Sequence, residues 1–309
     1  RSLSTTTGVW MRSAMSKARQ PYSKHSLTDP GSSRMASISP CPMLAAKARA
    51  PCEVRVGMPV LGPMRVTSHM STGTSAAVSV ALIGALDSLT PKRIHAQRMT
   101  PHEIALAAQK IETEMLGQQC GIQDQLCSAY GGISYIEMQN YPHASVSPIH
   151  VSNETWWELE RRLALVYLGN SHNSSQVHEM VIHGLENAGP GCPQLEDLRQ
   201  TAPRSRDALY AGNFPALGQA MIDNTEAQRR LHPALVSKDA EHVIEIARAH
   251  GALGWKVNGA GGEGGSLTLL CGPRAEVKRA MLHEIEAEGR GFKNIPIYLS
   301  RFGLRVWKT

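Results

Sequence analysis

A run of small residues, Gly73-Thr74-Ser75-Ala76-Ala77, stands directly before a mostly apolar stretch that extends to Leu86. Small side chains let the backbone approach a ligand closely, and the free N–H groups and dipole of a helix N-terminus favour an anion. A hydroxyl in the same turn can ligate Mg²⁺. The alternative interpretation is a hydrophobic helix capped by its hydroxyl residues. The run lacks the Gly-x-x-x-x-Gly-Lys-Ser/Thr spacing, which excludes an ordinary P-loop.

Two acidic residues farther along the chain, Glu112 and Asp124, could act together with this turn. A carboxylate held near a metal-bound phosphate can orient and deprotonate an attacking hydroxyl. Glu112 lies on a predicted helix whose opposite face is apolar, so it could share a cation with Ser75. The alternatives are a solvated surface acid for Glu112 and a helix N-cap for Asp124. The residues alone leave both interpretations open.

The third segment is rich in glycine and follows Lys256-Val257-Asn258. Five of the seven residues from Gly259 to Gly265 are glycine, between two predicted strands. Such a loop can adopt positive φ repeatedly and expose several N–H groups as a nest for an anion. A flexible hairpin tip is the alternative, although a hairpin needs fewer glycines.

In this order, the three segments resemble those of the GHMP kinase family, which includes galactokinase, homoserine kinase and mevalonate kinase. The 73–77 run is similar to the second half of the family's phosphate loop. The segment 111–132, which ends in Tyr130-Gly131-Gly132, is similar to its acidic motif, and 251–262 to its third motif. Gln123-Asp124-Gln125 and the sequence 256–262 are most similar to bacterial sugar kinases that act on D-glycero-D-manno-heptose 7-phosphate.

The resemblance implies phosphorylation of a sugar or sugar-phosphate hydroxyl, with ATP and Mg²⁺ as the cofactors. It implies a small-molecule partner and neither nucleic acid nor membrane as a partner. Asp124 would face the acceptor hydroxyl, and Ser75 and Glu112 would hold Mg²⁺. The residues that would bind ATP through their backbone are Gly73, Thr74, Ser75, Ala76 and Ala77, together with the closing turn of Gly259, Gly261 and Gly262.

Hydrophobic periodicity and turn signals predict an α+β fold, with helices on one face of an antiparallel sheet. The 76–86 helix should be buried all round, because it is apolar on every side. In the 100–117 helix, Thr100-Pro101 marks the start and a stripe from Ile104 to Met115 forms the apolar face. Further helices are expected at 121–131, 174–185, 207–231, 239–250 and 274–288, and strands at 133–138, 163–168, 255–258, 266–271 and 295–300.

By resemblance, these elements form two domains. Residues 71–190 would be an incomplete ATP-binding domain like the second domain of ribosomal protein S5, and 191–309 a ferredoxin-like domain. A loop rich in Gly, Pro and Asn, 187–193, marks the expected linker.

Residues 1–70 differ from the remainder of the chain. They carry ten Lys or Arg, two acidic residues and seven Pro, without a period of 2 or 3.6. This composition indicates disorder, and two origins stay open: an organellar transit peptide, or translation of an upstream stretch in the wrong frame. Nothing in 1–70 matches the family's first, substrate-binding motif, so impaired activity is expected.

Several classes of protein are excluded by composition. No run approaches the roughly 18 apolar residues of a membrane helix. The six cysteines are too sparse for a disulfide scaffold and include no Cys-x-x-Cys pair, so a reduced, cytoplasmic protein without structural zinc is expected. Besides a kinase, two alternatives stay open: a family member that binds sugar or nucleotide without catalysis (or an inactive truncated product), and an RNA-binding protein that uses its basic leader.

Overall fold

The computed structural model describes residues 55–56, 74–89, 98–118, 120–170, 174–185, 192–259, 261–262 and 264–307. The predictions for Gly73 and for nearly all of the 1–70 leader lie outside these residues.

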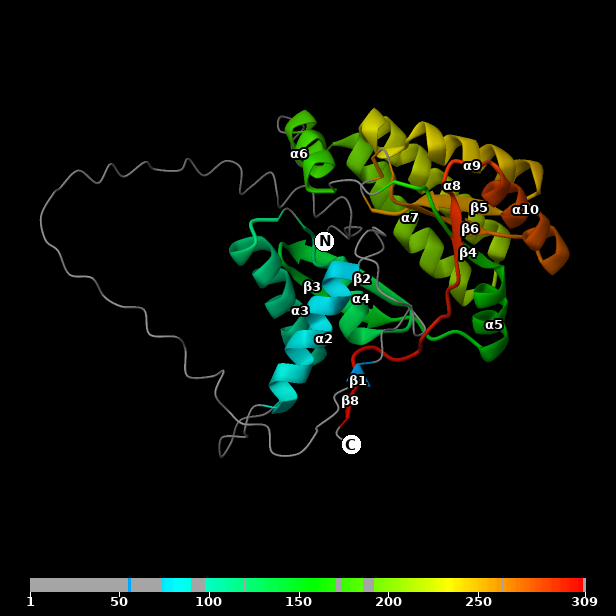
Figure 1. Cartoon of the computed structure of the whole chain (residues 1–309). Helices are drawn as coiled ribbons and strands as arrows, with labels where there is room; N and C mark the ends of the chain where they lie inside the picture. Colours follow the sequence, from blue (N-terminus) through cyan, green and yellow to red (C-terminus); the bar gives the residue numbers. More distant parts are fainter. Residues whose placement is uncertain are drawn as a thin grey trace, which may run out of the picture.

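The N-terminal part packs three helices on a β-hairpin (Figure 1). The helices are α2 (Thr74–Leu89), α3 (Pro101–Lys110), which continues as the π-helix η2 (Ile111–Met115), and α4 (Gln123–Tyr130). The hairpin pairs β2 (Ser134–Asn140) with β3 (His143–Pro148). One apolar core joins Val80, Ile104 and Leu126 of the helices to Ile136 of the hairpin.

The C-terminal part is built on a four-stranded antiparallel sheet with the strand order β5-β6-β4-β7. Val166 of β4 lies opposite Leu267 of β6, and both are fully buried. The helices α9 and α10 pack against this sheet through a core that includes Ile244 and Ile285. The strands are β4 (Leu163–Tyr167), β5 (Gly254–Val257), β6 (Ser266–Leu270) and β7 (Lys293–Ile295), and the two helices are α9 (Lys238–Ala249) and α10 (Ala275–Ala287).

Four more helical segments complete this part: α5 (Asn153–Arg162), α6 (Ser174–Gly184), α7 (Pro193–Tyr210) and α8 (Phe214–Leu231), with a short 3-10 helix η3 (Pro233–Leu235) after α8. The helix α8 approaches β5 so closely that a Cβ on Gly218 would lie 2.2 Å from the carbonyl oxygen of Leu253. Glycine is therefore required where α8 crosses the start of this strand.

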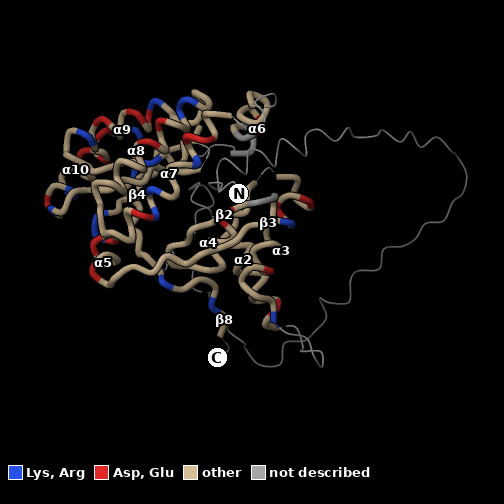
Figure 2. The backbone as a smooth tube through the Cα atoms, turned by 180° about the vertical axis from the view of Figure 1, so that it is seen from behind, with Lys and Arg blue, Asp and Glu red and all other residues tan. Residues whose placement is uncertain are grey.

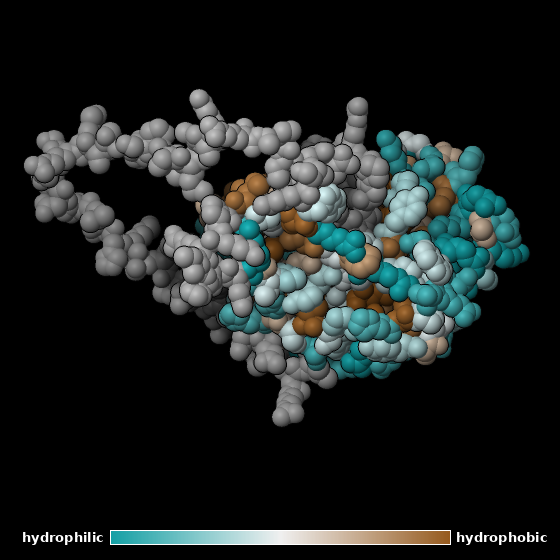
Figure 3. Space-filling view, turned by 90° about the horizontal axis from the view of Figure 1, so that it is seen from below, coloured by the Kyte–Doolittle hydropathy of each residue, from teal (hydrophilic) through white to brown (hydrophobic). Residues whose placement is uncertain are grey.

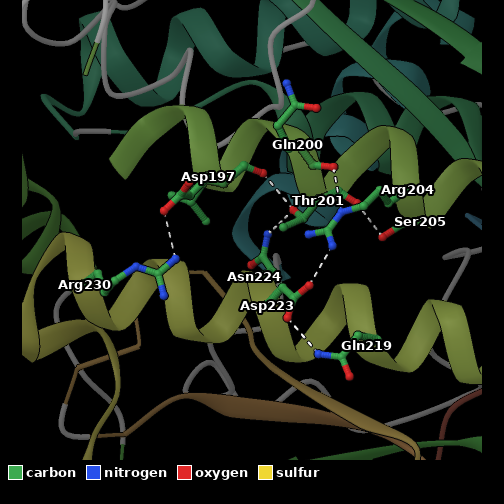
Figure 4. Close-up of polar contacts among 10 residues, drawn as sticks. Asp197, Gln200, Thr201, Arg204, Ser205, Gln219, Asp223, Asn224 and Arg230 are labelled. Atoms are coloured by element: carbon green, nitrogen blue, oxygen red, sulfur yellow. Dashed lines mark hydrogen bonds and ion pairs between the residues drawn. The ribbon is translucent and has the colours of Figure 1, made fainter. Parts of the chain in front are cut away.

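A polar seam joins α7 and α8 (Figure 4). Arg204 pairs with Asp223 at 2.7 Å, and Arg230 pairs with Asp197 at 2.9 Å. Between these exposed pairs, the Asn224 side-chain amide donates to the Thr201 hydroxyl at 2.8 Å. Charges of both signs are interspersed along α7–α10, whereas Asp87 is the single charged residue of α2 (Figure 2).

The C-terminal segment returns to the N-terminal helices (Figure 1). Its last strand, β8 (Val306–Trp307), pairs with β1 (Arg55–Val56). The Leu304 amide donates to the carbonyl of Ala129 at 3.1 Å, and a Cβ on Gly303 would lie 2.1 Å from that same oxygen. The two ends of the described chain therefore meet beside α2 and α4.

The antiparallel sheets and packed helices confirm the predicted α+β class, and most predicted elements occur. The predicted domain boundaries stay predictions. We note that β4, which lies inside the expected 71–190 domain, pairs with β6 and β7 of the C-terminal sheet.

Four expectations about single elements were wrong. The helix α2 is not buried all round, because Val78, Leu82 and Leu86 are exposed on one side of it. Hydrophobic residues also reach the surface on the face of the molecule that Figure 3 shows. Met115 is exposed because the wider π turn carries it off the α-helical stripe. The last sheet strand is 293–295, not 295–300, and the expected 207–231 helix is two helices, α7 and α8, with a break at 211–213.

Candidate active site

The carboxylate of Glu112 is the centre of the site and is 3% exposed. Its Oε1 accepts a hydrogen bond from the Ser75 hydroxyl at 2.9 Å and lies 3.4 Å from the Ser79 hydroxyl. Its Oε2 accepts from Nε2 of Gln125, and from the Cys120 thiol at 3.5 Å. Donors from α2, from α4 and from the loop between η2 and α4 thus converge on one buried carboxylate, which offsets the cost of removing it from water.

Local structure explains how Glu112 reaches this position. The helix α3 begins with a capping box, in which Thr100 and Glu103 bond to each other's backbone N–H. Its continuation is wound as a π-helix, so the Leu116 amide bonds to the carbonyl of Ile111 at 3.0 Å. Short π segments occur frequently at functional sites. This one turns Glu112 inward, so the alternative interpretation of Glu112 as a solvated surface acid is wrong.

Asp124 lies in the first turn of α4, and the N-cap of that helix is Ile122. The N-cap interpretation of Asp124 is therefore wrong. The side chain is exposed to solvent, yet the protein around it raises the pKa of its carboxyl group, first by desolvation and second through the charge of Glu112. The charge of Lys256 acts in the opposite direction.

Lys256 comes from β5, at the start of the glycine-rich segment. Its Nζ donates to the carbonyl of Val257 at 2.9 Å. Burial lowers the pKa of this ammonium group to about 8, against the opposing effect of the Asp124 charge. Lys256 therefore links Asp124 of the N-terminal part to the strand that leads into the glycine turn.

The glycine turn is held in place by α8 and η3. Gln228 of α8 donates through Nε2 to the carbonyl of Gly259 at 3.0 Å, and the Gly262 amide donates to the carbonyl of Ala234 at 3.0 Å. Gly261 and Gly262 are buried, while Gly259 is exposed. Packing against η3 fixes Gly261 and Gly262, so the interpretation as a flexible hairpin tip is wrong for these two residues.

The structure brings several of the predicted site residues together. Ser75 and Glu112 are in contact, and Asp124 interacts electrostatically with Glu112 and Lys256. The backbone of Thr74 begins α2, while the side chain of Ala76 is buried in the core and that of Ala77 is half-buried. A ligand at this turn would therefore meet Ala76 mainly through its backbone.

Sequence reasoning assigned no role to Gln125, Cys120 or Lys256. The available signals were the position of Gln125 directly after Asp124 and that of Lys256 three residues before Gly259. The donors on Glu112 could not be read from spacing, because they lie on separate elements.

The pair of Ser75 and Glu112 fits a magnesium ion that also binds a nucleotide. Mg²⁺ prefers oxygen ligands and usually takes one or two protein oxygens, several waters and the substrate phosphates. In the described part of the chain no group of three or more His, Cys, Asp and Glu side chains could hold a metal by itself. The Gln125 Oε1, which is buried without a hydrogen-bond partner among the described residues, leaves an acceptor beside this pair.

Known proteins carry the same sequence pattern. The family model for the GHMP kinases N terminal domain matches residues 55–132, which include Ser75, Glu112 and Asp124. This segment is therefore similar to the N-terminal domain of the GHMP kinases. This match begins before residue 71, where the domain was expected to start, and it ends at Gly132, just after α4.

Two curated proteins that are similar to this chain are named as kinases of small molecules. A D-glycero-alpha-D-manno-heptose 7-phosphate kinase from Campylobacter jejuni is 27% identical over 165 residues, which are 53% of this chain and 48% of the relative. A mevalonate kinase from Thermococcus sibiricus is 26% identical over 260 residues, which are 82% of this chain and 70% of the relative. The chain thus spans about half the length of the heptose kinase.

Solved structures confirm the GHMP kinase fold. The galactokinase of Lactococcus lactis, solved with galactose, superposes with a TM-score of 0.59 at 15% identity, over 78% of this chain and 68% of that one. At this identity the likeness concerns the fold alone. The described helices include none that is long and apolar enough to cross a membrane.

Proposed function

We propose that this chain transfers the γ-phosphoryl group of ATP to a hydroxyl of a sugar or sugar phosphate. The observation that carries the proposal is the hydrogen bond between Ser75 and Glu112, next to the exposed carboxylate of Asp124. Phosphoryl transfer requires mainly positioning and neutralisation of charge. A hydroxyl, a buried carboxylate and a second, solvent-facing carboxylate supply the groups for that task.

Each group has a specific part in the proposed reaction. The N-terminal turn of α2, including the backbone of Thr74 to Ala77, binds the phosphates of ATP. Ser75 and Glu112 hold Mg²⁺, which neutralises the charge of the bound phosphates when present. Asp124 orients the acceptor hydroxyl and receives its proton. The Lys256 ammonium group counters the charge of Asp124.

The glycine turn bounds the site on the side of the C-terminal sheet. Its exposed residue, Gly259, has a φ of 62°, a conformation that favours glycine. With Gly261 and Gly262 fixed against η3, this turn closes over the phosphate region without having to order itself on binding. Such preorganisation reduces the entropy cost of holding the substrates in line.

The acceptor class is proposed from the relatives. The heptose 7-phosphate kinase matches 53% of this chain, and its name identifies a phosphorylated sugar as its substrate. We therefore propose a sugar phosphate as the preferred acceptor, with a free sugar as the second candidate.

The experiment is an ADP-release assay of the purified full chain with Mg-ATP and three acceptors: heptose 7-phosphate, galactose and mevalonate. We expect turnover with the heptose phosphate that exceeds the ATPase rate without acceptor by at least 10-fold. ³¹P NMR of the product should show a new phosphate ester. Mg-ATP binding without acceptor-dependent ADP release for any of the three would favour a non-catalytic binding protein and contradict the proposal.

A further inference from the structure

The side-chain amide of Gln125 is anchored at one end only. It is 2% exposed, on the inner side of α4. Its Nε2 donates to Oε2 of Glu112, while its Oε1 is buried and has no hydrogen-bond partner among the described residues. A buried carbonyl oxygen without a partner loses its hydration without compensation, so this arrangement costs stability in the absence of a ligand.

The two oxygens of Glu112 have different kinds of partner. Oε2 already accepts hydrogen bonds from two groups, the Gln125 amide and the Cys120 thiol. Oε1 faces the hydroxyls of Ser75 and Ser79. A hydroxyl both donates and accepts, so Ser75 can turn a lone pair toward a cation and still remain beside Oε1. The carboxylate is thus open to a cation on the Oε1 side.

We infer that Gln125 is the positioning residue of the divalent-cation site. Its Nε2 holds Oε2 of Glu112 and thereby directs Oε1 toward Ser75, and its free Oε1 accepts a hydrogen bond from a water of the bound cation. This role rests on the proposed function, because the cation is the one that accompanies ATP. It assigns the two consecutive residues of α4 to different tasks: Asp124 faces the acceptor and Gln125 orients the metal ligand.

The chain offers a matched control in Gln109 of α3. Gln109 is 4% exposed, and its amide bonds to the hydroxyls of Thr113 and Tyr141. It is therefore a glutamine of similar burial whose amide, unlike that of Gln125, bonds to hydroxyl groups and not to Glu112. Substitution of either glutamine by methionine keeps the length of the side chain and removes its amide group.

The test measures Mn²⁺ binding with a non-hydrolysable ATP analogue, by the EPR signal of free Mn²⁺, in the wild type, Gln125→Met and Gln109→Met. Loss of a group that orients a metal ligand typically weakens metal binding by about 10- to 100-fold. We expect that loss for Gln125→Met and a change below about 2-fold for Gln109→Met, with comparable decreases in melting temperature. Should Gln125→Met fail to fold, Gln125→Asn, whose amide is one methylene shorter, is expected to show the same weakening.

The outcomes separate this inference from the proposed function. Mn²⁺ binding by the wild type that is unchanged in Gln125→Met, or that falls equally in both variants, overturns the positioning role and leaves the kinase proposal intact. A wild type that binds neither the nucleotide analogue nor Mn²⁺ overturns both. Metal-free nucleotide affinity should be equal in all three proteins.

Discussion

The ammonium group of Lys256 and the carboxylate of Asp124 interact electrostatically, although one residue lies on β5 of the C-terminal sheet and the other on α4 of the N-terminal part. Their charges act on each other's pKa in opposite directions, and Glu112 acts on Asp124 as a like charge. The site therefore contains two acids and one lysine that come from both halves of the chain. Because folding shifts the pKa values of Asp124 and Lys256, the stability of the protein depends on whether these site residues are charged.

Lys256→Met should stabilise the folded chain at neutral pH. Folding lowers the pKa of Lys256 from 10.5 to about 8, so between these values the unfolded chain binds more protons. The free energy of unfolding therefore rises with pH across this window, and below pH 8 the charged lysine lowers stability. In urea unfolding at pH 7, we expect the free energy of unfolding of the variant to exceed that of the wild type by on the order of 1 kcal/mol. Between pH 8 and 10, the free energy of unfolding should rise less in the variant than in the wild type.

Lys110→Met is the control for this prediction. Lys110 is exposed on α3 and makes a surface ion pair with Glu114 at 3.7 Å, so its removal changes the net charge equally. Such a pair contributes less than about 1 kcal/mol. Equal pH profiles for the two variants would show that burial of Lys256 has no measurable effect.

Substitutions at two glycines of the turn distinguish the stability cost of close packing from the cost of an unfavourable backbone conformation. Gly261 and Gly259 both have a φ of 62°. A Cβ on Gly261 would lie 1.9 Å from the carbonyl oxygen of Leu235, while a Cβ on Gly259 would have no atom of the described residues within 4 Å. We expect Gly259→Ala to cost about 1–2 kcal/mol from the left-handed conformation. Gly261→Ala should cost about 2–5 kcal/mol, because the backbone of η3 must also shift. Equal losses in thermal or urea unfolding would mean that the loop does not pack on η3.

The buried hydroxyl of the seam between α7 and α8 (Figure 4) should contribute more to the stability of the protein than the ion pairs of the seam do. Thr201 is 3% exposed, accepts from the Asn224 amide and donates to the carbonyl of Leu198 at 2.7 Å. Thr201→Val leaves the Asn224 amide without this acceptor, and Asn224 Oδ1 already has no hydrogen-bond partner within the described part of the chain. We expect a loss of about 1–3 kcal/mol. Arg204→Ala should lose less than about 1 kcal/mol, because its pair with Asp223 is solvent-exposed. The reverse order in urea unfolding would contradict this assignment.

Periodicity predicted the elements that hold the site, because each has a local signal. The capped start at Thr100-Pro101 and the glycines at 131 and 132 mark the limits of helices that the structure contains. The break between α7 and α8 was missed, because the two helices meet at a short turn, Ala211-Gly212, within a continuous helical pattern. The apolar outer face of α2 was mistaken for a buried face, because hydropathy gives no information about which neighbours are present.

The site itself was predictable in residue type and not in geometry. Glu112 was a candidate by its order relative to Ser75, but its burial depends on a π turn and on donors from α2 and α4. No spacing rule indicates such a turn. The role of Lys256 depends on the way β5 faces α4, which only the tertiary structure shows.

The most direct test of the central claim compares affinity and turnover in one variant, Asp124→Asn. We predict that acceptor-dependent ADP release falls by about 10²- to 10⁴-fold, while the Kd for a Mg-nucleotide analogue, measured by calorimetry, stays within about 3-fold of the wild type. The variant should also be more stable at pH 7, because the raised pKa of Asp124 means that its charge lowers stability there. Undiminished turnover in a folded Asp124→Asn protein would contradict the account.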